Sequence, residues 1–187
     1  WSWELLAPWE QAAFAQCSTF DGGFTLDAAE AVVDLTVWAD APPVMDVIEA
    51  LANKSLLRTW VPGEQGRYDI EEPHFGMYVS LHEYAAEKLE EAGSQARHLA
   101  EERHGRHFAG FGTDDALEAL SRHGGVRRRR ALALELDNLV AACDRATIRD
   151  DHGIATATFC AAWEVLELRG PFALAVTLGN RVLSRAH

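Results

Sequence analysis

Apolar residues recur at intervals of three and four positions along most of this chain, which is the period of an amphipathic helix. The pattern is clearest within residues 44–55, where the apolar positions are Val44, Val47, Ile48 and Leu51. Residues 6–55 hold three such segments, separated by the turn-forming sequences DGG and ADAPP. Thr25 has the side chain and the position of an N-cap for the second segment. The spacing therefore predicts three helices in this part of the chain.

The period changes after residue 54. Residues 55–60 (SLLRTW) and 66–70 (GRYDI) are short β-prone runs joined by the turn sequence VPGEQG, so they predict a β-hairpin. Residues 75–79 (FGMYV) are a candidate third strand. Three helices followed by a hairpin is the order of a winged helix, and a further helix from Leu81 closes this unit.

From Ser94 onwards the sequence predicts only helices, each bounded by Gly, Pro or Asp. Their lengths and many Ala residues are typical of stacked antiparallel helical hairpins like a tetratricopeptide (TPR) array, although no 34-residue repeat is visible. The predicted fold is thus mainly α: a winged-helix domain with a small β-hairpin over residues 1–92, then a TPR-like helical region over residues 93–187. The first residue is Trp, and we expect the chain to be a piece of a longer protein with a truncated array.

The charge is distributed unevenly. Residues 1–92 hold 17 Asp/Glu against 4 Lys/Arg (−13), whereas residues 93–187 hold 12 against 13 (+1). The acidic half is expected to repel nucleic acid and membranes. The chain contains neither a run of 18 apolar residues nor a signal-peptide pattern, and its three cysteines form no CxxC pair, so we expect a cytoplasmic protein without disulfides.

Several motifs together resemble one known family. The sequence WSWELLAPWEQAAFAQCSTFDGGFTLDAAEAV resembles the segment that follows the nucleotide-binding module in bacterial signal-transduction ATPases of the STAND class, the NB-ARC relatives. The sequences LANKSLL, RYDI, EYAAEKL, RHGRHF and LELDNLVAAC resemble later motifs of these proteins, so that the likeness covers about the first 145 residues. The matches in the first segment are Trp1, Ser2, Leu5, Leu6, Pro8, Glu10, Gln11, Phe14, Phe20, Gly22, Gly23, Phe24, Ala28, Ala29 and Glu30.

The resemblance implies a regulatory function. In such proteins a winged helix couples the nucleotide state of an NB-ARC domain, here expected upstream of Trp1, to a helical-repeat region that binds a protein partner or a small-molecule inducer. ADP or ATP would bind the full-length protein; this chain lacks the G-x-x-x-x-G-K-[ST] phosphate loop, so we expect neither a bound cofactor nor catalysis from it alone. Two alternatives stay open: a DNA-binding winged-helix transcriptional regulator, and a scaffold domain without a switch.

His82 is the candidate binding residue. Ser80 and Glu83 have the spacing of a capping box, which places His82 beside the free N–H groups at a helix start, where anions bind. LHE at 81–83 resembles the Met-His-Asp-like motif of NB-ARC proteins, whose histidine contacts the β-phosphate of ADP. The resemblance implies that His82 is an ADP phosphate sensor; the alternative is an exposed polar residue in a capped turn.

Two further groups of residues are weighed as sites. His98, Glu102, His104 and His107 crowd one region, but interleaved arginines disfavour a metal ion, so no metal site is expected. The RRRR sequence at 127–130 suits either an acidic or nucleic-acid partner, or a solvated helix turn that pairs with nearby acids, and we favour the second.

The third predicted helix bears on the DNA-binding alternative. It offers Asp46 and Glu49 against a single cation, Lys54. A recognition helix needs cations for phosphates, so nucleic acid is not an expected partner of this domain.

Overall fold

The computed structural model describes residues 2–65 and 70–185. These residues are mainly helical and include one three-stranded antiparallel sheet. The chain forms two compact units, one within residues 1–65 and 71–104 and the other built mainly from residues 105–187. The division falls inside helix α5 (Ser94–Ala109), so the first unit extends past residue 92.

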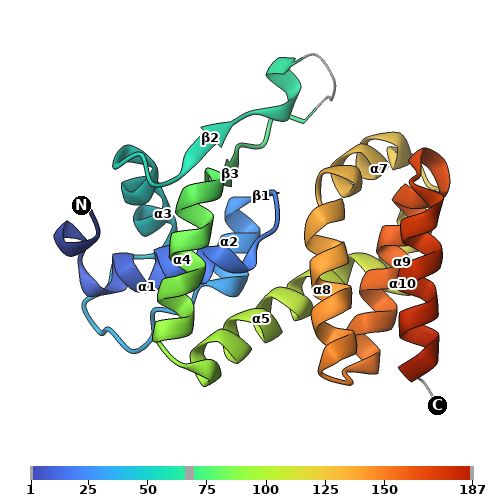
Figure 1. Ribbon diagram of the computed structural model, residues 1–187. Helices are drawn as coiled ribbons and strands as arrows, with labels where there is room; N and C mark the ends of the chain where they lie inside the picture. Colours follow the sequence, from blue (N-terminus) through green and yellow to red (C-terminus); the bar gives the residue numbers. More distant parts are fainter. Residues whose placement is uncertain (1, 66–69, 186–187) are drawn as a thin grey trace. The chain divides into compact units, whose positions relative to one another are not determined.

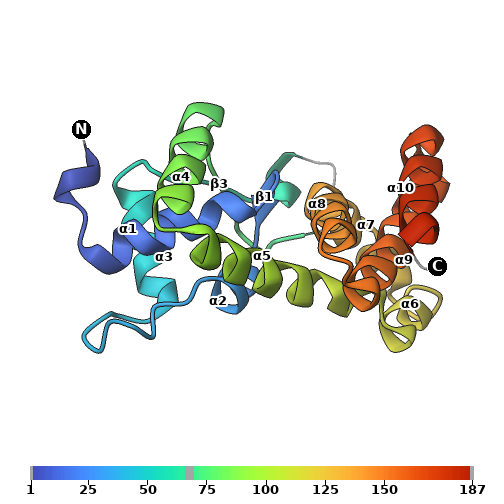
Figure 2. The same cartoon turned by 60° about the horizontal axis from the view of Figure 1, so that its bottom comes forward.

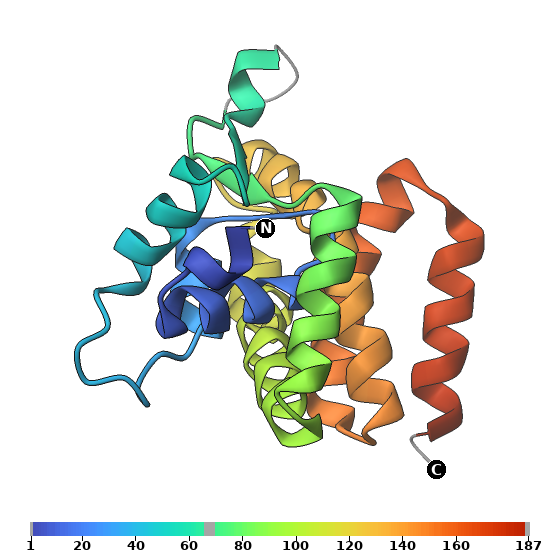
Figure 3. The same ribbon diagram turned by 60° about the vertical axis from the view of Figure 1, so that its left-hand side comes forward.

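Helices α1 (Pro8–Gln16), α2 (Leu26–Val32) and α3 (Val44–Asn53) lie within the three segments that the apolar spacing predicts to be helical (Figure 1). The side chain of Thr25 caps α2 by accepting a hydrogen bond from the Ala28 N–H at 3.2 Å, which confirms the predicted N-cap. Figure 3 shows the green helix α4 crossing beside the blue segment that contains α1, and these two helices pack together. The helices are α1 (Pro8–Gln16), α2 (Leu26–Val32), α3 (Val44–Asn53), α4 (Val79–Glu91) and the first part of α5, with short 3-10 helices η1 (Ser2–Leu5), η2 (Cys17–Thr19) and η3 (Pro62–Gln65).

The sheet has the strand order β1–β3–β2, with β1 (Gly23–Phe24), β2 (Arg58–Trp60) and β3 (His74–Gly76) all antiparallel. Two features differ from the predicted hairpin of residues 55–60 and 66–70. The sheet includes β1, a strand that is too short to show a period of two in the sequence. The strand β2 pairs with β3, with Thr59 opposite Phe75, rather than with a strand at 66–70 among the described residues. Most of the expected partner strand at 66–70 lies outside the described residues, and Ile70, which is described, belongs to no strand.

The aromatic core of the first unit joins the sheet to the helices. Phe20 and Phe24 stack with ring centroids 4.3 Å apart, and both are 1% exposed. Gly23 leaves room for the indole of Trp60, because a Cβ at this position would lie 2.6 Å from that ring. Phe14, Ile48 and Leu51, which are fully buried, bring α1 and α3 into the same core.

The second unit contains only helices among its described residues. Helices α8 and α9, then α9 and α10, are neighbours joined by short connections (Figure 1), and α6 packs against η4, which packs against α9 (Figure 2). The core of this unit includes Leu139, Leu166 and Leu178, all fully buried. The elements are η4 (Gly110–Gly112), α6 (Asp114–Ala119), α7 (Gly125–Leu134), α8 (Leu136–Ile148), α9 (His152–Arg169) and α10 (Phe172–Arg185), after the end of α5.

The sequence VRRRRALALELDNLVAACDRATI, from Val126 to Ile148, predicts one continuous helix, but the structure interrupts it at Glu135. The N–H of Glu135 bonds to the carbonyl oxygen of Leu132, three residues earlier, which tightens the chain and ends α7. Glu135 is 7% exposed and its carboxylate accepts a hydrogen bond from the Asn138 side chain. The spacing of apolar residues carries no information about these hydrogen bonds, so the sequence predicts one helix where the structure has two.

No helix in the described part of the chain combines the length and the apolar character that crossing a bilayer requires.

Candidate functional site

His82 lies in the first turn of α4, but the helix begins differently from the prediction. Its N-cap is Tyr78, which gives no side-chain hydrogen bond, and Ser80 is the second helical residue. The carbonyl oxygen of Tyr78 accepts from the N–H groups of both Leu81 and His82, each at 2.9 Å. The expected capping box of Ser80 and Glu83 is therefore wrong, because the backbone of Tyr78 already starts the helix two residues before Leu81.

The imidazole of His82 is half-buried and contacts the backbone of Phe20. Its Nε2 atom lies 3.1 Å from the carbonyl oxygen of Phe20. A carbonyl oxygen can only accept, so Nε2 carries the proton and donates it. This hydrogen bond connects α4 to the segment between η2 and β1. The other ring nitrogen, Nδ1, is the atom with which His82 would bind a second partner.

The start of α4 has the polarity that suits an anion. Its first turn contains no acidic residue, and the first N–H groups of any helix lack intrahelical partners. The guanidinium of Arg58 lies 6.0 Å from the ring centroid of Tyr78 and 4.5 Å from that of Trp60. Tyr78 is 62% exposed and Val79 76% exposed, so this helix end faces solvent in the first unit and is open to a ligand or a second surface.

The exposed side of α3 is acidic. Asp46 and Glu49 are exposed, whereas Lys54, at the end of the helix, binds the carboxylate of Glu10 with Nζ–O distances of 2.5 and 2.6 Å. Glu10 is 7% exposed and also accepts from the N–H of Ala7. Burial tends to raise the pKa of Glu10, but the hydrogen bonds from Lys54 and Ala7 and the charge of Lys54 outweigh it and hold the pKa below its ordinary value. The cation at the end of α3 is thus paired with Glu10, although 40% of the Lys54 side chain remains exposed.

Two histidines of α5, His104 and His107, pack against aromatic rings, whereas His98 is exposed. His104 is fully buried with its ring edge-on to Phe20 at 5.5 Å, and His107 lies edge-on to Phe108 at 5.0 Å. Within residues 2–65 and 70–185, no group of three or more His, Cys, Asp or Glu side chains is arranged to hold a metal ion.

The arginine run lies in α7 and its members have different surroundings. Arg127 and Arg128 are exposed, and Arg128 donates to the carbonyl oxygens of His123 and Ala119. Arg129 pairs with Glu164 on α9. Pairing with an acid was expected for this run, but this partner comes from a helix 35 positions further on rather than from the neighbouring sequence.

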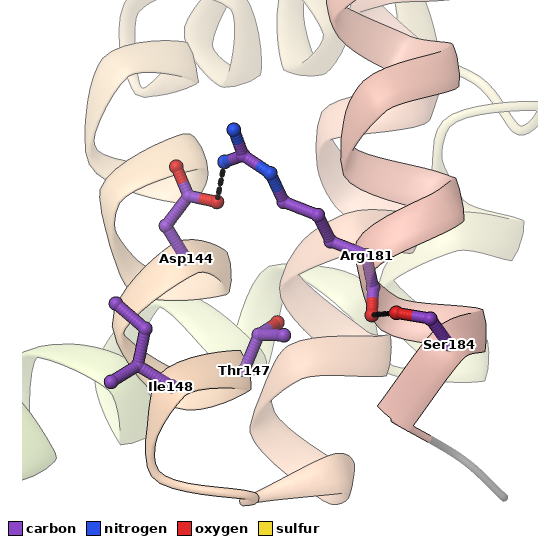
Figure 4. Close-up of a pocket in the computed structure, with 5 residues that line it drawn as sticks. All are labelled: Asp144, Thr147, Ile148, Arg181 and Ser184. Atoms are coloured by element: carbon purple, nitrogen blue, oxygen red, sulfur yellow. Dashed lines mark hydrogen bonds and ion pairs between the residues drawn. The ribbon is translucent and has the colours of Figure 1, made fainter.

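One surface hollow lined by described residues of the second unit has a volume of about 310 Å³. It lies between α8 and α10 and is lined by Asp144, Thr147, Ile148, Arg181 and Ser184 (Figure 4). Its polar side chains bond within the protein: Arg181 to Asp144 at 2.7 Å, Thr147 to the carbonyl oxygen of Cys143, and Ser184 to that of Arg181. Another hollow, of about 150 Å³, lies between α7 and α9.

The sequence does not indicate one half-buried polar network in the first unit. The amide of Gln16 donates to the carbonyl oxygen of Asp34 and accepts from the Asp34 N–H, and Arg103 donates to the same Gln16 oxygen at 2.8 Å. Arg103 also donates to the carbonyl oxygen of Val32 at 2.7 Å. Gln16 and Arg103 are 87 positions apart in the chain, so no local sequence pattern indicates that they are in contact.

Comparison with known proteins gives no relative: no family model, no curated protein and no solved structure matches this chain.

Proposed function

We propose that this chain is a regulatory part of a STAND-type ATPase. Its first unit would be a winged helix that responds to the nucleotide state of an NB-ARC domain elsewhere in the full-length protein. Its second unit would be the start of a TPR-like region that receives an inducer or a protein partner. Switches of this kind use two packings of similar energy that nucleotide and ligand bias in opposite directions.

The order of elements in the first unit supports this proposal most. The chain runs α1, β1, α2, α3, β2, β3 with the sheet order β1–β3–β2. This is the order that we expect of a winged helix, and it occurs in the residues that resemble STAND proteins. The consecutive packing of α8 on α9 and of α9 on α10 is in turn typical of stacked helical hairpins.

His82 is the proposed sensor of the ADP phosphate. Nε2 donates to Phe20, so an anion would be bound by Nδ1–H, with both ring nitrogens protonated. The unpaired N–H groups at the start of α4 would add a favourable field for negative charge. The same hydrogen bond to Phe20 would pass a movement of the ring to the chain before β1.

Two substitutions separate the sensor role from the structural one in the full-length protein. In His82→Gln the amide nitrogen takes the place of Nε2 and keeps a donor for Phe20, but the second donor is lost; His82→Ala loses both. A sensor predicts weaker ADP binding in both variants, measured by calorimetry. Weaker binding in His82→Ala alone would assign His82 a structural role, and unchanged ADP affinity and basal ATPase activity in both would exclude the sensor. His98→Ala, at an exposed position of α5, is the matched control.

DNA binding is the second candidate function, and the winged-helix order of elements favours it. The charge of α3 opposes it, because Asp46 and Glu49 face solvent while Lys54 is bound by Glu10. A gel-shift titration at low salt distinguishes the two functions. A retarded band that disappears as salt rises would support a DNA reader.

A further inference from the structure

A hollow in the surface of the first unit combines an apolar lining with one carboxylate. It has a volume of about 220 Å³ and lies between α1, the segment 33–43 and the junction of α4 with α5. We name it the Trp38 hollow. The lining residues that carry the argument are Asp34, Val37, Trp38, Leu89, Ala96 and Leu99.

Two turns hold Trp38 at the edge of this hollow. The N–H of Trp38 donates to the carbonyl oxygen of Leu35 at 3.0 Å, and the N–H of Ala41 donates to that of Trp38 at 3.1 Å. Leu35 is 7% exposed and anchors the segment in the core of the first unit. Backbone hydrogen bonds and a buried anchor thus place the indole, so this side of the hollow is formed before a ligand binds.

The apolar lining of the Trp38 hollow is partly open to water. Val37 is 84% exposed and Leu99 is 42% exposed, whereas Leu89 is buried. Ala96 on α5 is half-buried and fills little space, because its side chain is a methyl group. A cavity of about 150 Å³ holds a benzene molecule, so the Trp38 hollow has room for an aromatic ring with a short substituent. Such a ring would remove apolar surface of Val37 and Leu99 from water, which is favourable.

Asp34 supplies the polar part of the site. Its Oδ1 atom accepts from the N–H and the hydroxyl of Thr36 at 3.0 and 2.7 Å. Its Oδ2 atom accepts no hydrogen bond from the residues that the structure describes; the guanidinium of Arg103 lies 3.7 Å away and donates to Val32 and Gln16. The hydrogen bonds from Thr36 hold the pKa of Asp34 below its ordinary value, so the group is a carboxylate at neutral pH.

The charge around the hollow favours a cation over an anion. Arg103 offsets part of the charge of Asp34, but residues 1–92 together carry −13 and the whole chain −12. The side chain of Asp34 is 41% exposed, so an ammonium group can approach from solvent and donate to its Oδ2 atom. A carboxylate or phosphate in the same place would instead face the negative charge of Asp34.

We propose that the Trp38 hollow binds a small organic cation, in which a short chain joins an ammonium group to an aromatic ring. The ring packs against Trp38, Leu89 and Leu99 and covers Val37, and the ammonium group donates to Oδ2 of Asp34. The indole of Trp38 adds aromatic and cation–π attraction. A small concave site with an apolar lining and one free acceptor atom suits a small molecule. This inference does not depend on the nucleotide switch proposed above.

The test titrates the full 187-residue chain with 2-phenylethylamine, 2-phenylethanol and phenylacetate, which share a ring and differ in charge. NMR follows the indole N–H signal of Trp38, identified as the one of six tryptophan signals that is lost in Trp38→Phe. The ammonium ion is expected to bind about fivefold more tightly than the alcohol, the upper range for an exposed ion pair, and phenylacetate more weakly than the alcohol. Methylamine, an ammonium ion without a ring, should leave the signal unchanged.

Matched variants locate the site. Asp34→Asn keeps an acceptor for Thr36 but removes the charge, so it should bind the ammonium ion and the alcohol equally. Asp40→Asn removes the same charge from an exposed position of the same segment outside the hollow and should keep the fivefold preference. Ala96→Leu fills the hollow and should abolish binding of both compounds. Ala86→Leu makes the same change at an exposed position of α4 outside the lining and should bind like the native chain.

Five outcomes would overturn the proposal: no shift of the Trp38 signal by 2-phenylethylamine, equal affinity for the alcohol, an equal response to methylamine, a preference that Asp34→Asn and Asp40→Asn affect alike, or binding that survives Ala96→Leu. Should Ala96→Leu fail to fold in urea titrations, the ratio of affinities in Asp34→Asn decides, because it compares two compounds on one folded chain. The ADP measurements on His82 use another ligand, so the two proposals fail independently.

Discussion

The Nε2 atom of His82 on α4 lies 3.1 Å from the carbonyl oxygen of Phe20, a residue 62 positions earlier in the chain. This contact joins the helix that closes the first unit to the aromatic core, where Phe20 stacks on Phe24. The residue that we propose as a phosphate sensor thus also connects α4 to the segment before β1. The connecting role, unlike the sensor role, predicts that replacing His82 destabilises the first unit.

We expect His82→Ala to lower the free energy of unfolding of the first unit by about 1 kcal/mol, because the carbonyl oxygen of Phe20 loses its donor. Urea unfolding followed by tryptophan fluorescence measures this, since five of the six tryptophans lie in residues 1–60. His82→Gln, which keeps a donor at this position, should lose less. A stability equal to that of the exposed control His98→Ala would contradict the expectation.

The ion pair of Glu10 and Lys54 predicts a pH dependence. The pKa of Glu10 in the folded chain lies below its ordinary value of 4.5, so its carboxylate stabilises the fold above about pH 4.5 and loses this effect as the pH falls through the lower, folded pKa. Lys54 keeps 40% of its side chain exposed, so we expect Glu10→Gln to cost only about 1 kcal/mol near neutral pH.

The measurement is the unfolding free energy of the native chain and Glu10→Gln between about pH 7 and pH 3. The difference between them should stay constant down to about pH 5 and shrink below pH 4.5. Glu30→Gln, on the exposed side of α2, removes the same charge without the buried contacts. A difference that grows on acidification would show that Glu10 is not stabilised as the carboxylate.

The sequence predicted the elements whose causes are local. The apolar spacing of α3 and the Thr25 cap of α2 depend on residues within one or two turns, and the structure confirms both. The spacing of Ser80 and Glu83 predicts that α4 starts at Leu81, but the helix starts at Val79 because the carbonyl oxygen of Tyr78 accepts the first helical hydrogen bonds. The two-residue strand β1 exists only because β3 pairs with it, so nothing in its own sequence predicts it.

The candidate sites show the same division. His82 could be identified as a residue near a helix start, but its bond to Phe20 joins distant segments and has no sequence signal. The arginine run was visible, yet only the fold shows that Arg129 and Arg130 face a groove with Leu168 while Arg127 does not line it. Charge can be read from a sequence, whereas its pairing across helices cannot.

The close packing of Gly112 against α9 leaves no room for a larger residue at this position of the second unit. A Cβ at Gly112 would lie 1.8 Å from the carbonyl oxygen of Ala157 on α9, and a backbone atom inside a helix cannot move away cheaply. We expect Gly112→Ala to destabilise this unit by about 3 kcal/mol, the upper range for overpacking, and to speed amide hydrogen exchange along α9.

Gly110→Ala is the matched control for Gly112→Ala, because it lies in the same short helix η4 and its Cβ would have no atom within 4 Å. This variant should exchange like the native chain. Equal protection of α9 in both variants would mean that η4 does not pack on α9 as described.

The three cysteines predict an order of chemical reactivity. Cys17 is buried at 1% exposure and Cys143 at 1%, whereas Cys160 is half-buried, and burial raises the pKa of all three thiols above the ordinary value of 9.0. Alkylation requires the thiolate and access to it, so iodoacetamide should modify Cys160 first and Cys17 last. Mass spectrometry of proteolytic fragments at increasing times gives the three rates.

The rate at Cys160 should also rise steadily between about pH 7 and pH 9, with no plateau in that range, because its raised pKa keeps the thiol mostly protonated there. In concentrated urea the three rates should converge, which controls for differences in the neighbouring sequence. If Cys17 reacted as fast as Cys160 in the folded chain, the packing of η2 into the core of the first unit would be wrong, and with it the position of the Phe20 carbonyl that His82 binds.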